Sequence, residues 1–224
     1  MLPWILLDTA PIPGDTGELR LYQRGSEYSI RLGHYELMNS RVHASEDALA
    51  HLACARLAGR ARPRILIGGL GIGFTLAAVL QSTGPDAEVV ISELVPAVVA
   101  WNRGPLADIA GRPLEDPRVV VRETDVALLI RGAKAAYDAI LLDVDNGPAA
   151  LTAKGNDRIY STTGLRAAYN ALRPGGILGV WVSGPAPSFT PRLRQAGFTV
   201  DEVPVRGQTA SKGPRYRIWL AQRG

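Results

Sequence analysis

Four short apolar runs, each leading to a glycine or an acidic residue and followed by a stretch with helical spacing, constrain the fold of this chain more than any other feature. Strands that carry helices on both faces are buried on both sides, and they therefore show this continuous apolar pattern. We predict an α/β fold with a mostly parallel, doubly wound sheet. The runs occupy residues 65–67, 89–91, 119–121 and 139–142.

The last part of the chain predicts how this sheet ends. A helix over 161–172, an Arg-Pro-Gly-Gly turn at 173–176 and a strand over 177–182 form a fifth unit. Two further runs, 199–205 and 216–221, enclose a polar loop and predict a terminal antiparallel hairpin. A parallel sheet closed by an antiparallel last strand is typical of the class I methyltransferase fold, whereas dehydrogenase sheets usually continue parallel.

The N-terminal segment predicts a separate unit of structure. It is rich in glycine and proline, and its short alternating runs are typical of a small antiparallel sheet. Ser45 is a suitable N-cap for a helix that has two acidic residues in its first turn and ends at Gly59. We therefore divide the chain into a small N-terminal β segment, residues 1–43, and a Rossmann-like domain, residues 44–224.

The composition is that of an ordinary soluble domain, with 46% apolar and 21% charged residues. The net charge of +4 could indicate an anionic partner, but the arginines are scattered along the chain, which favours a solvated surface over a nucleic-acid interface. Cys54 is the single cysteine, so an internal disulfide is excluded. Its apolar neighbours predict a small buried helix residue rather than a catalytic thiol.

Neither a metal nor a membrane is expected. The three histidines lack the spacing of metal ligands, both with one another and with the cysteine. The apolar opening at residues 1–7 has no basic segment before it and reaches Asp8 too soon for a signal peptide or a membrane span. The expected location is the cytoplasm.

A glycine-rich segment, Ile-Gly-Gly-Leu-Gly-Ile-Gly-Phe, directly follows the first buried strand and opens a helix. Glycines at such a place let backbone amides approach a ligand closely. A dinucleotide fingerprint needs glycine or alanine at its sixth position, where this chain has Phe74, so NAD is disfavoured. The spacing of Gly69, Gly71 and Gly73 matches an adenosylmethionine loop instead. A tight turn without a ligand is the alternative.

Two acidic residues follow the next two strands. Glu93 stands at about the distance at which an acid meets the ribose hydroxyls of a bound nucleoside. Its alternative is an acid at a helix N-terminus, before Val95 and Pro96. Asp125 can accept from an adenine amine, and it can also be the N-cap of a helix over 126–130; the two roles can coexist.

The fourth strand leads into Asp143-Val-Asp145-Asn-Gly-Pro, which places two carboxylates at the carboxyl edge of the sheet. Ligands of open α/β sheets bind at that edge. A solvated turn is the alternative, because Asp, Asn, Gly and Pro all form turns. Asp143 directly follows buried strand residues, which favours a functional role for it.

With these motifs in place, the chain resembles the spermidine synthase family over roughly residues 35–185. The resemblance rests on the glycine loop, Glu93, the Asp-Pro-Arg-Val that leads to Asp125, Asp143, and the segment from Tyr160 to the Pro-Gly-Gly. It implies transfer of an aminopropyl group from decarboxylated S-adenosylmethionine to putrescine, although some relatives transfer methyl. It also implies that Glu93 holds the ribose, Asp125 the adenine amine and Asp143 the acceptor amine.

The chain departs from the family in the pocket that would receive the substrate tails. The family's glycine loop carries an aspartate that binds the amine of the aminopropyl tail, and Gly71 stands there. Ser45 and Glu46 replace a tyrosine and a glutamine. The family's Asp-Ser-Ser-Asp-Pro is reduced to Asp-Val-Asp-Asn. The cofactor scaffold therefore resembles the family more than the acceptor pocket does.

We predict a transferase that uses S-adenosylmethionine to methylate a small-molecule amine, because Gly71 lacks the acid that would select the decarboxylated cofactor. Asp143, helped by Asp145, would orient the amine and accept its proton. The alternatives are an aminopropyltransferase that uses decarboxylated S-adenosylmethionine and a non-catalytic nucleoside-binding protein. The Asp-Asn-Gly-Pro at 145–148 lacks the Pro-Pro-aromatic signature of nucleic-acid methyltransferases, so no nucleic-acid partner is expected. The resemblance also implies that the chain could form a homodimer.

Overall fold

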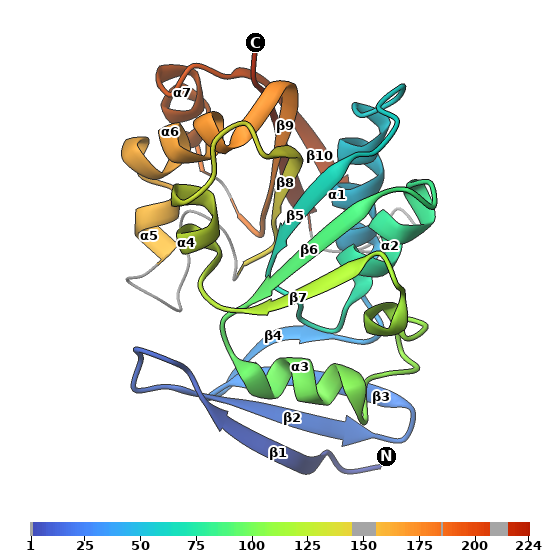
Figure 1. Cartoon of the computed structure of the whole chain (residues 1–224). Helices are drawn as coiled ribbons and strands as arrows, with labels where there is room; N and C mark the ends of the chain where they lie inside the picture. The colour runs from blue at the N-terminus through green and yellow to red at the C-terminus, as the bar shows by residue number, and fades with distance from the viewer. Residues whose placement is uncertain (1, 145–155, 185, 207–214) are drawn as a thin grey trace.

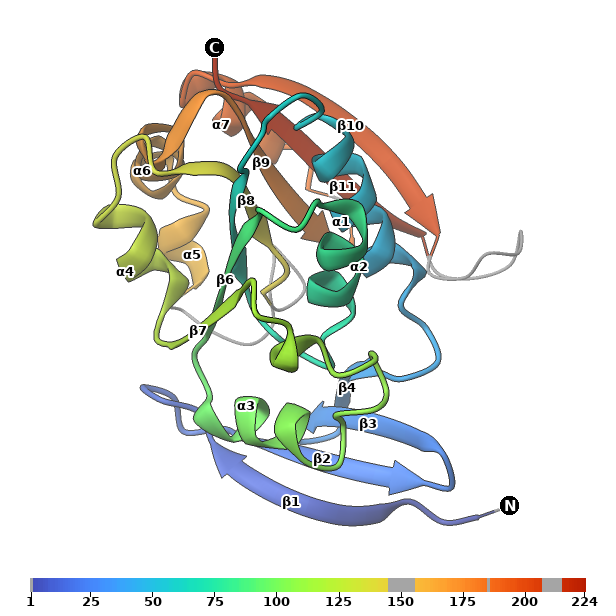
Figure 2. The same ribbon diagram turned by 45° about the vertical axis from the view of Figure 1, so that its right-hand side comes forward.

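The computed structural model describes residues 2–144, 156–184, 186–206 and 215–224. This part of the chain forms a seven-stranded sheet and a four-stranded sheet. Figures 1 and 2 show the four-stranded sheet below the larger sheet. Helix α3 (Pro96–Arg103) lies against the four-stranded sheet. The space between the two sheets is where the site described below forms.

The seven-stranded sheet has the order β10-β11-β9-β8-β5-β6-β7. The neighbours from β9 to β7 all pair in parallel, whereas β11 pairs antiparallel with β9 and β10 antiparallel with β11. The predicted fold class, a mostly parallel sheet with a terminal antiparallel hairpin, is confirmed. The strands are β5 (Arg64–Gly68), β6 (Glu88–Glu93), β7 (Val119–Glu123), β8 (Tyr137–Leu142), β9 (Leu172–Val182), β10 (Thr199–Arg206) and β11 (Arg215–Gln222).

Helices cover both faces of this sheet, with α1 and α2 on one side and α4 to α7 on the other (Figures 1 and 2). Ile65 and Ile67 pack into the core of the first face, and Leu66 between them packs into the core of the second. Burial on both faces is the reason for the continuous apolar runs. The other helices are α1 (Ala44–Ala55), α2 (Phe74–Ser82), η1 (Pro113–Glu115), α4 (Val126–Arg131), α5 (Asn156–Ile159), α6 (Thr162–Ala171) and α7 (Phe189–Gln195).

The four-stranded sheet is an antiparallel meander in chain order. Its first strand was not predicted, because Ile5 and Leu6 are 61% and 49% exposed and the strand shows no alternation of apolar and polar residues. Leu21 and Ile30 on the next two strands are buried and join the core of the first face. The strands are β1 (Ile5–Pro11), β2 (Glu18–Arg24), β3 (Glu27–Leu32) and β4 (Tyr35–Asn39).

Two local predictions are corrected. Helix α1 begins two residues earlier than expected, with His43 rather than Ser45 as N-cap, so Ser45 lies inside the first turn and its hydroxyl donates to the Glu46 carboxylate. The Arg-Pro-Gly-Gly segment lies within the bounds of β9 and bulges there, because Tyr137 pairs with Leu172 and Ala139 with Ile177, so residues 173–176 fall outside the register with β8. Gly175 has φ +72°, and its N–H donates to the Arg223 carbonyl at 2.9 Å after the last strand.

The single cysteine, Cys54, is buried in α1 as predicted, and burial raises the pKa of its thiol to about 11. A thiol of this kind is protonated near neutral pH and is a poor nucleophile. None of the helices in the described part of the chain is long and apolar enough to cross a membrane.

Candidate active site

A two-lobed pocket opens at the carboxyl ends of β5, β6 and β8, between them and the four-stranded sheet. Both lobes are lined by Leu37, Met38, Gly71 and Asp143, so they adjoin there. The first lobe extends towards the ends of β6 and β7, and the second extends towards α1 and the start of α2. Ligands of open α/β sheets bind in this position.

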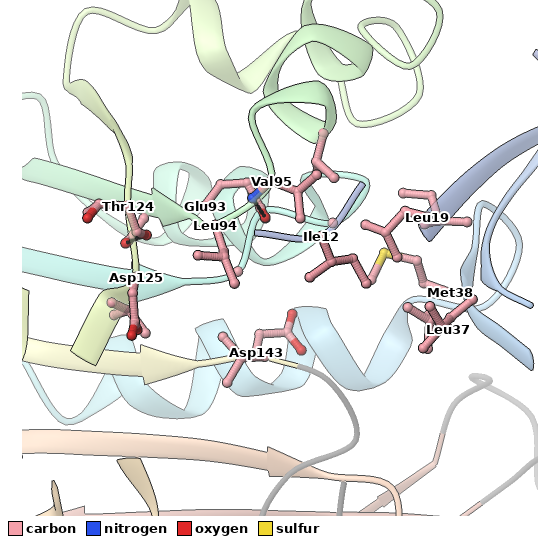
Figure 3. Close-up of a pocket in the computed structure, with 18 residues that line it drawn as sticks. Ile12, Leu19, Leu37, Met38, Glu93, Leu94, Val95, Thr124, Asp125 and Asp143 are labelled. Atoms are coloured by element: carbon pink, nitrogen blue, oxygen red, sulfur yellow. Dashed lines mark hydrogen bonds between the residues drawn. The ribbon is translucent and has the colours of Figure 1, made fainter. Parts of the chain in front are cut away.

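The first lobe has acidic groups on the side of the large sheet and an apolar wall on the side of the small one. Glu93, Asp125 and Asp143 line it from three successive strand ends, together with Gly69 and Gly71. Figure 3 shows Asp125 on one side of the lobe and Met38 and Leu37 on the other, with Asp143 facing Glu93 and Leu94 across it. The apolar wall from the small sheet consists of Ile12, Leu19, Ile30, Leu32, Leu37 and Met38.

The glycine loop turns tightly under this pocket. Gly69 has φ +88°, and a Cβ atom there would lie 2.4 Å from the backbone carbonyl oxygen of Asp143. Only glycine fits such an approach. The carbonyl of Gly71 accepts from Nδ2 of the buried Asn102 at 2.8 Å, a contact that holds the loop from α3. Gly73 lines neither lobe and faces Asn102 and η1 instead, so its role in cofactor binding stays a prediction.

Glu93 is 8% exposed and connects three parts of the site. Its Oε2 accepts the N–H of Leu70 in the glycine loop at 2.9 Å, and its Oε1 accepts the N–H of Val95 at 2.9 Å. These bonds fix the carboxylate on the wall of the first lobe, which Glu93 lines. Glu93 therefore acts as an acid at the N-terminus of α3, which is the alternative interpretation of this residue. This role is compatible with a contact between Glu93 and a ribose.

Asp125 caps α4, because its Oδ1 accepts the N–H of Ala127 at 2.8 Å. The residue also lines the first lobe. The N-cap predicted from the sequence is confirmed, and contact with an adenine amine stays a prediction that the position allows.

Asp143 stands where the two lobes adjoin. Its backbone N–H donates to the Gly68 carbonyl at 3.0 Å, which extends the pairing of β8 with β5. Its Oδ2 accepts from the hydroxyl of Thr75 on α2 at 2.6 Å. The sequence did not single out Thr75, although its place in the first turn of the helix after the glycine loop could have done so. The predicted partner Asp145 lies outside the described residues.

The second lobe is acidic. Its described lining contains two charged side chains, Glu46 from α1 and Asp143 from β8, beside Thr75 and Trp181. Burial, and after it the negative charge of Asp143, raises the pKa of Glu46 to about 7. A cation that binds beside this carboxyl group stabilises its charged form, because the cation offsets both the burial and the repulsion from Asp143. The remaining lining residues are Leu37, Met38, Leu70, Gly71, Ile72 and Phe74.

Trp181 adds an aromatic wall to the second lobe. Its ring centroid lies 4.9 Å from that of Tyr216 on β11, and its buried Nε1 has no hydrogen-bond partner within the described part of the chain. Burial, with a smaller contribution from the Glu46 charge, raises the pKa of Tyr216. The described residues contain no group of three or more His, Cys, Asp or Glu side chains placed to hold a metal.

The site residues predicted from the sequence thus fall into two groups. Gly69, Gly71, Glu93, Asp125 and Asp143 gather around one pocket, as expected from the shared carboxyl edge of the sheet. Sequence reasoning did not place Met38, Asn102 or Trp181 at the site, and it named Glu46 only as a departure from the family's pocket.

Known proteins were compared with this chain by sequence. A protein from Mycobacterium tuberculosis, named polyamine aminopropyltransferase, is 29% identical over 201 residues, which cover 86% of this chain and 35% of that protein. Polyamine aminopropyltransferase 1 of Streptomyces coelicolor is 30% identical over 202 residues, covering 85% of this chain and 34% of that protein. The chain is similar to polyamine aminopropyltransferases. It spans about a third of the length of these curated relatives, and no family model matches it.

The fold is likewise similar to that of a solved spermidine synthase. The crystal structure of spermidine synthase from Thermotoga maritima superposes with a TM-score of 0.77 at 18% identity, covering 98% of this chain and 73% of that one. The resemblance to the spermidine synthase family is confirmed. The preference for methyl transfer over aminopropyl transfer is not supported, because the named sequence relatives are aminopropyltransferases.

Proposed function

We propose that this chain transfers the aminopropyl group of decarboxylated S-adenosylmethionine to a small aliphatic amine such as putrescine. The position of Asp143 carries the proposal, because this carboxylate lines both lobes and so stands where the tail of a donor bound in the first lobe and an acceptor amine would meet. The similarity of the chain to named polyamine aminopropyltransferases supports aminopropyl over methyl as the transferred group.

The first lobe suits the nucleoside part of such a cofactor. Gly69 lets the backbone approach closely, and Glu93 presents a buried carboxylate, a hydrogen-bond acceptor of the kind that ribose hydroxyls bind. The apolar side chains of the small sheet, Leu19 and Met38 among them, supply a surface on which a flat base can pack. The bound cofactor supplies an electrophilic carbon next to a sulfonium.

The acceptor amine must be neutral to attack that carbon. In the proposed reaction Asp143 accepts a hydrogen bond from the amine, aims its lone pair at the first lobe and takes up the proton that the nitrogen loses. The Thr75 hydroxyl fixes one oxygen of Asp143, which leaves the carboxylate in one orientation. General-base assistance of this kind contributes roughly 10² to 10⁴ in rate, and alignment of the two reactants contributes roughly 7 to 11 kcal/mol.

Product analysis tests the proposal. The purified chain is incubated with putrescine and either decarboxylated S-adenosylmethionine or S-adenosylmethionine, and the nucleoside product is identified by mass spectrometry. We expect methylthioadenosine from the decarboxylated cofactor. Adenosylhomocysteine as the only product would refute aminopropyl transfer in favour of methyl transfer. Nucleoside binding without turnover of any amine tested would favour the non-catalytic alternative.

A further inference from the structure

Glu46 is an acid of the second lobe that has no role in the proposed reaction. It lies in the first turn of α1 and lines the lobe together with the glycine-loop residues Leu70, Gly71 and Ile72. A chain that leaves the first lobe past Gly71 and Asp143 therefore enters a space with Glu46 on its wall.

The glycine loop has no room for an acid of its own while Met38 keeps its present position. A Cβ atom at Gly71 would lie 2.6 Å from Sδ and 3.0 Å from Cε of Met38. Real side chains do not approach so closely, so the thioether occupies space that a side chain at position 71 would need, and the flexible end of Met38 would have to move to admit one.

Acidic charge is present elsewhere in the lining of the second lobe. Glu46 and Asp143 are the charged residues among the described lining of the second lobe, and both are acids. The Ser45 hydroxyl bonds Oε2 of Glu46 and so holds the carboxylate at one of its oxygens. The aromatic ring of Trp181, on the same lobe, also attracts cations. A lobe built in this way suits an ammonium group and repels a carboxylate.

We propose that Glu46 binds the ammonium at the end of the aminopropyl tail, in place of the acid that the glycine loop lacks at Gly71. This inference rests on the proposed function. It makes Glu46 the residue that distinguishes the two cofactors, because the tail of S-adenosylmethionine carries an α-carboxylate beside its ammonium. That carboxylate would enter a lobe that already holds two acids.

The electrostatics of Glu46 agree with this role. The ionisable groups that act on it are Asp143 from the end of β8, Asp47 on its own helix, and Tyr216 on β11, whose own pKa is raised in part by the Glu46 charge. A pKa of about 7 means that Glu46 gains its charge between pH 6 and pH 8. Affinity for the ammonium should therefore rise over this interval.

Calorimetric titration of three ligands tests the inference. Decarboxylated S-adenosylmethionine carries the ammonium alone, S-adenosylmethionine carries ammonium and carboxylate, and methylthioadenosine carries neither. We expect Glu46→Gln to weaken the binding of the decarboxylated cofactor about ten- to a hundredfold, because one charge-assisted hydrogen bond is lost. Methylthioadenosine should bind unchanged, and the preference for the decarboxylated cofactor should shrink. Asp47→Asn, which removes the neighbouring acid from the same helix turn, is the matched control; Asp47 makes only the smallest contribution to the raised pKa of Glu46, so this variant should not weaken binding of any of the three ligands.

The outcomes separate this inference from the function it rests on. Equal affinity of wild type and Glu46→Gln for the decarboxylated cofactor would overturn the role of Glu46 and leave aminopropyl transfer standing. A wild-type chain that binds only S-adenosylmethionine would overturn the proposed function itself. If Glu46→Gln does not fold, as shown by lost methylthioadenosine binding, the pH dependence of binding to the wild type tests the inference instead. The affinity of the wild type for the decarboxylated cofactor, relative to methylthioadenosine, should rise from pH 6 to pH 8, and a flat ratio would overturn the inference.

Discussion

Replacing Glu46 with glutamine should stabilise the ligand-free protein at alkaline pH and not at acidic pH. The fold raises the pKa of this carboxyl from its ordinary 4.5 to about 7, chiefly by burial. The folded state therefore binds more protons than the unfolded state between these values, and stability falls as the pH rises through this window. Each pKa unit corresponds to about 1.4 kcal/mol, so the cost of the charge well above pH 7 is at most about 3.5 kcal/mol. Because the residue is partly exposed, we expect about 2 kcal/mol.

Urea unfolding at pH 5 and pH 8.5 measures this effect. Glu46→Gln removes the titration and keeps the size of the side chain and its capacity to accept from Ser45. The difference in unfolding free energy between variant and wild type should be about 2 kcal/mol more favourable to the variant at pH 8.5 than at pH 5. Asp47→Asn serves as control. The same difference at both pH values would refute the claim that the fold opposes the charge of Glu46.

Three further substitutions probe the first lobe and the junction. Glu93→Ala should weaken methylthioadenosine binding by roughly 1.5 to 3 kcal/mol in calorimetry, and it should also lower stability, because two backbone N–H groups lose their acceptor; unchanged affinity would remove Glu93 from the ligand site. Asp143→Asn should lower kcat by roughly 10² to 10⁴ and leave nucleoside affinity nearly unchanged, and a wild-type rate would contradict the proposed base. Gly69→Ala should destabilise the chain by more than roughly 2 kcal/mol in urea unfolding, whereas Gly33→Ala, at φ +56° with no atom within 4 Å of the new Cβ, should cost only about 1 kcal/mol; equal costs would show that the approach to Asp143 is not tight.

The sequence predicted the large sheet well because burial leaves a strong pattern. Strands such as β5 and β8 are buried on both faces, so the run 139–142 is apolar throughout and Asp143 marks its end. Acids that follow such strands share one edge of the sheet, and Glu93, Asp125 and Asp143 accordingly meet in one pocket. The pattern was weakest in β1, an edge strand with exposed apolar side chains. The division of the chain at residues 43 and 44 stays a prediction.

The second lobe could not be predicted in the same way, because its walls come from elements that only tertiary structure brings together. The resemblance named Glu46 as a departure from the family's pocket, but an acid in the first turn of a helix also suits the helix dipole, so the sequence alone indicates no role for it. Met38 belongs to β4 of the small sheet and Trp181 to β9 of the large one. Neither has a spacing that relates it to the glycine loop. Their proximity depends on how the small sheet and α1 pack over the end of the large sheet.

This dependence explains why Gly71, taken alone, pointed to methyl transfer. The prediction of methyl transfer assumes that an acid which binds a cofactor amine must stand at one position of the glycine loop. An ammonium is bound by the charge near it, whichever element supplies that charge, and a glutamate on a neighbouring helix supplies the same charge as an aspartate on the loop. With Met38 packed against Gly71, an acid elsewhere in the lining of the second lobe needs no change in the loop. The specificity of the second lobe therefore has to be judged from all the charges on its walls rather than from the loop sequence.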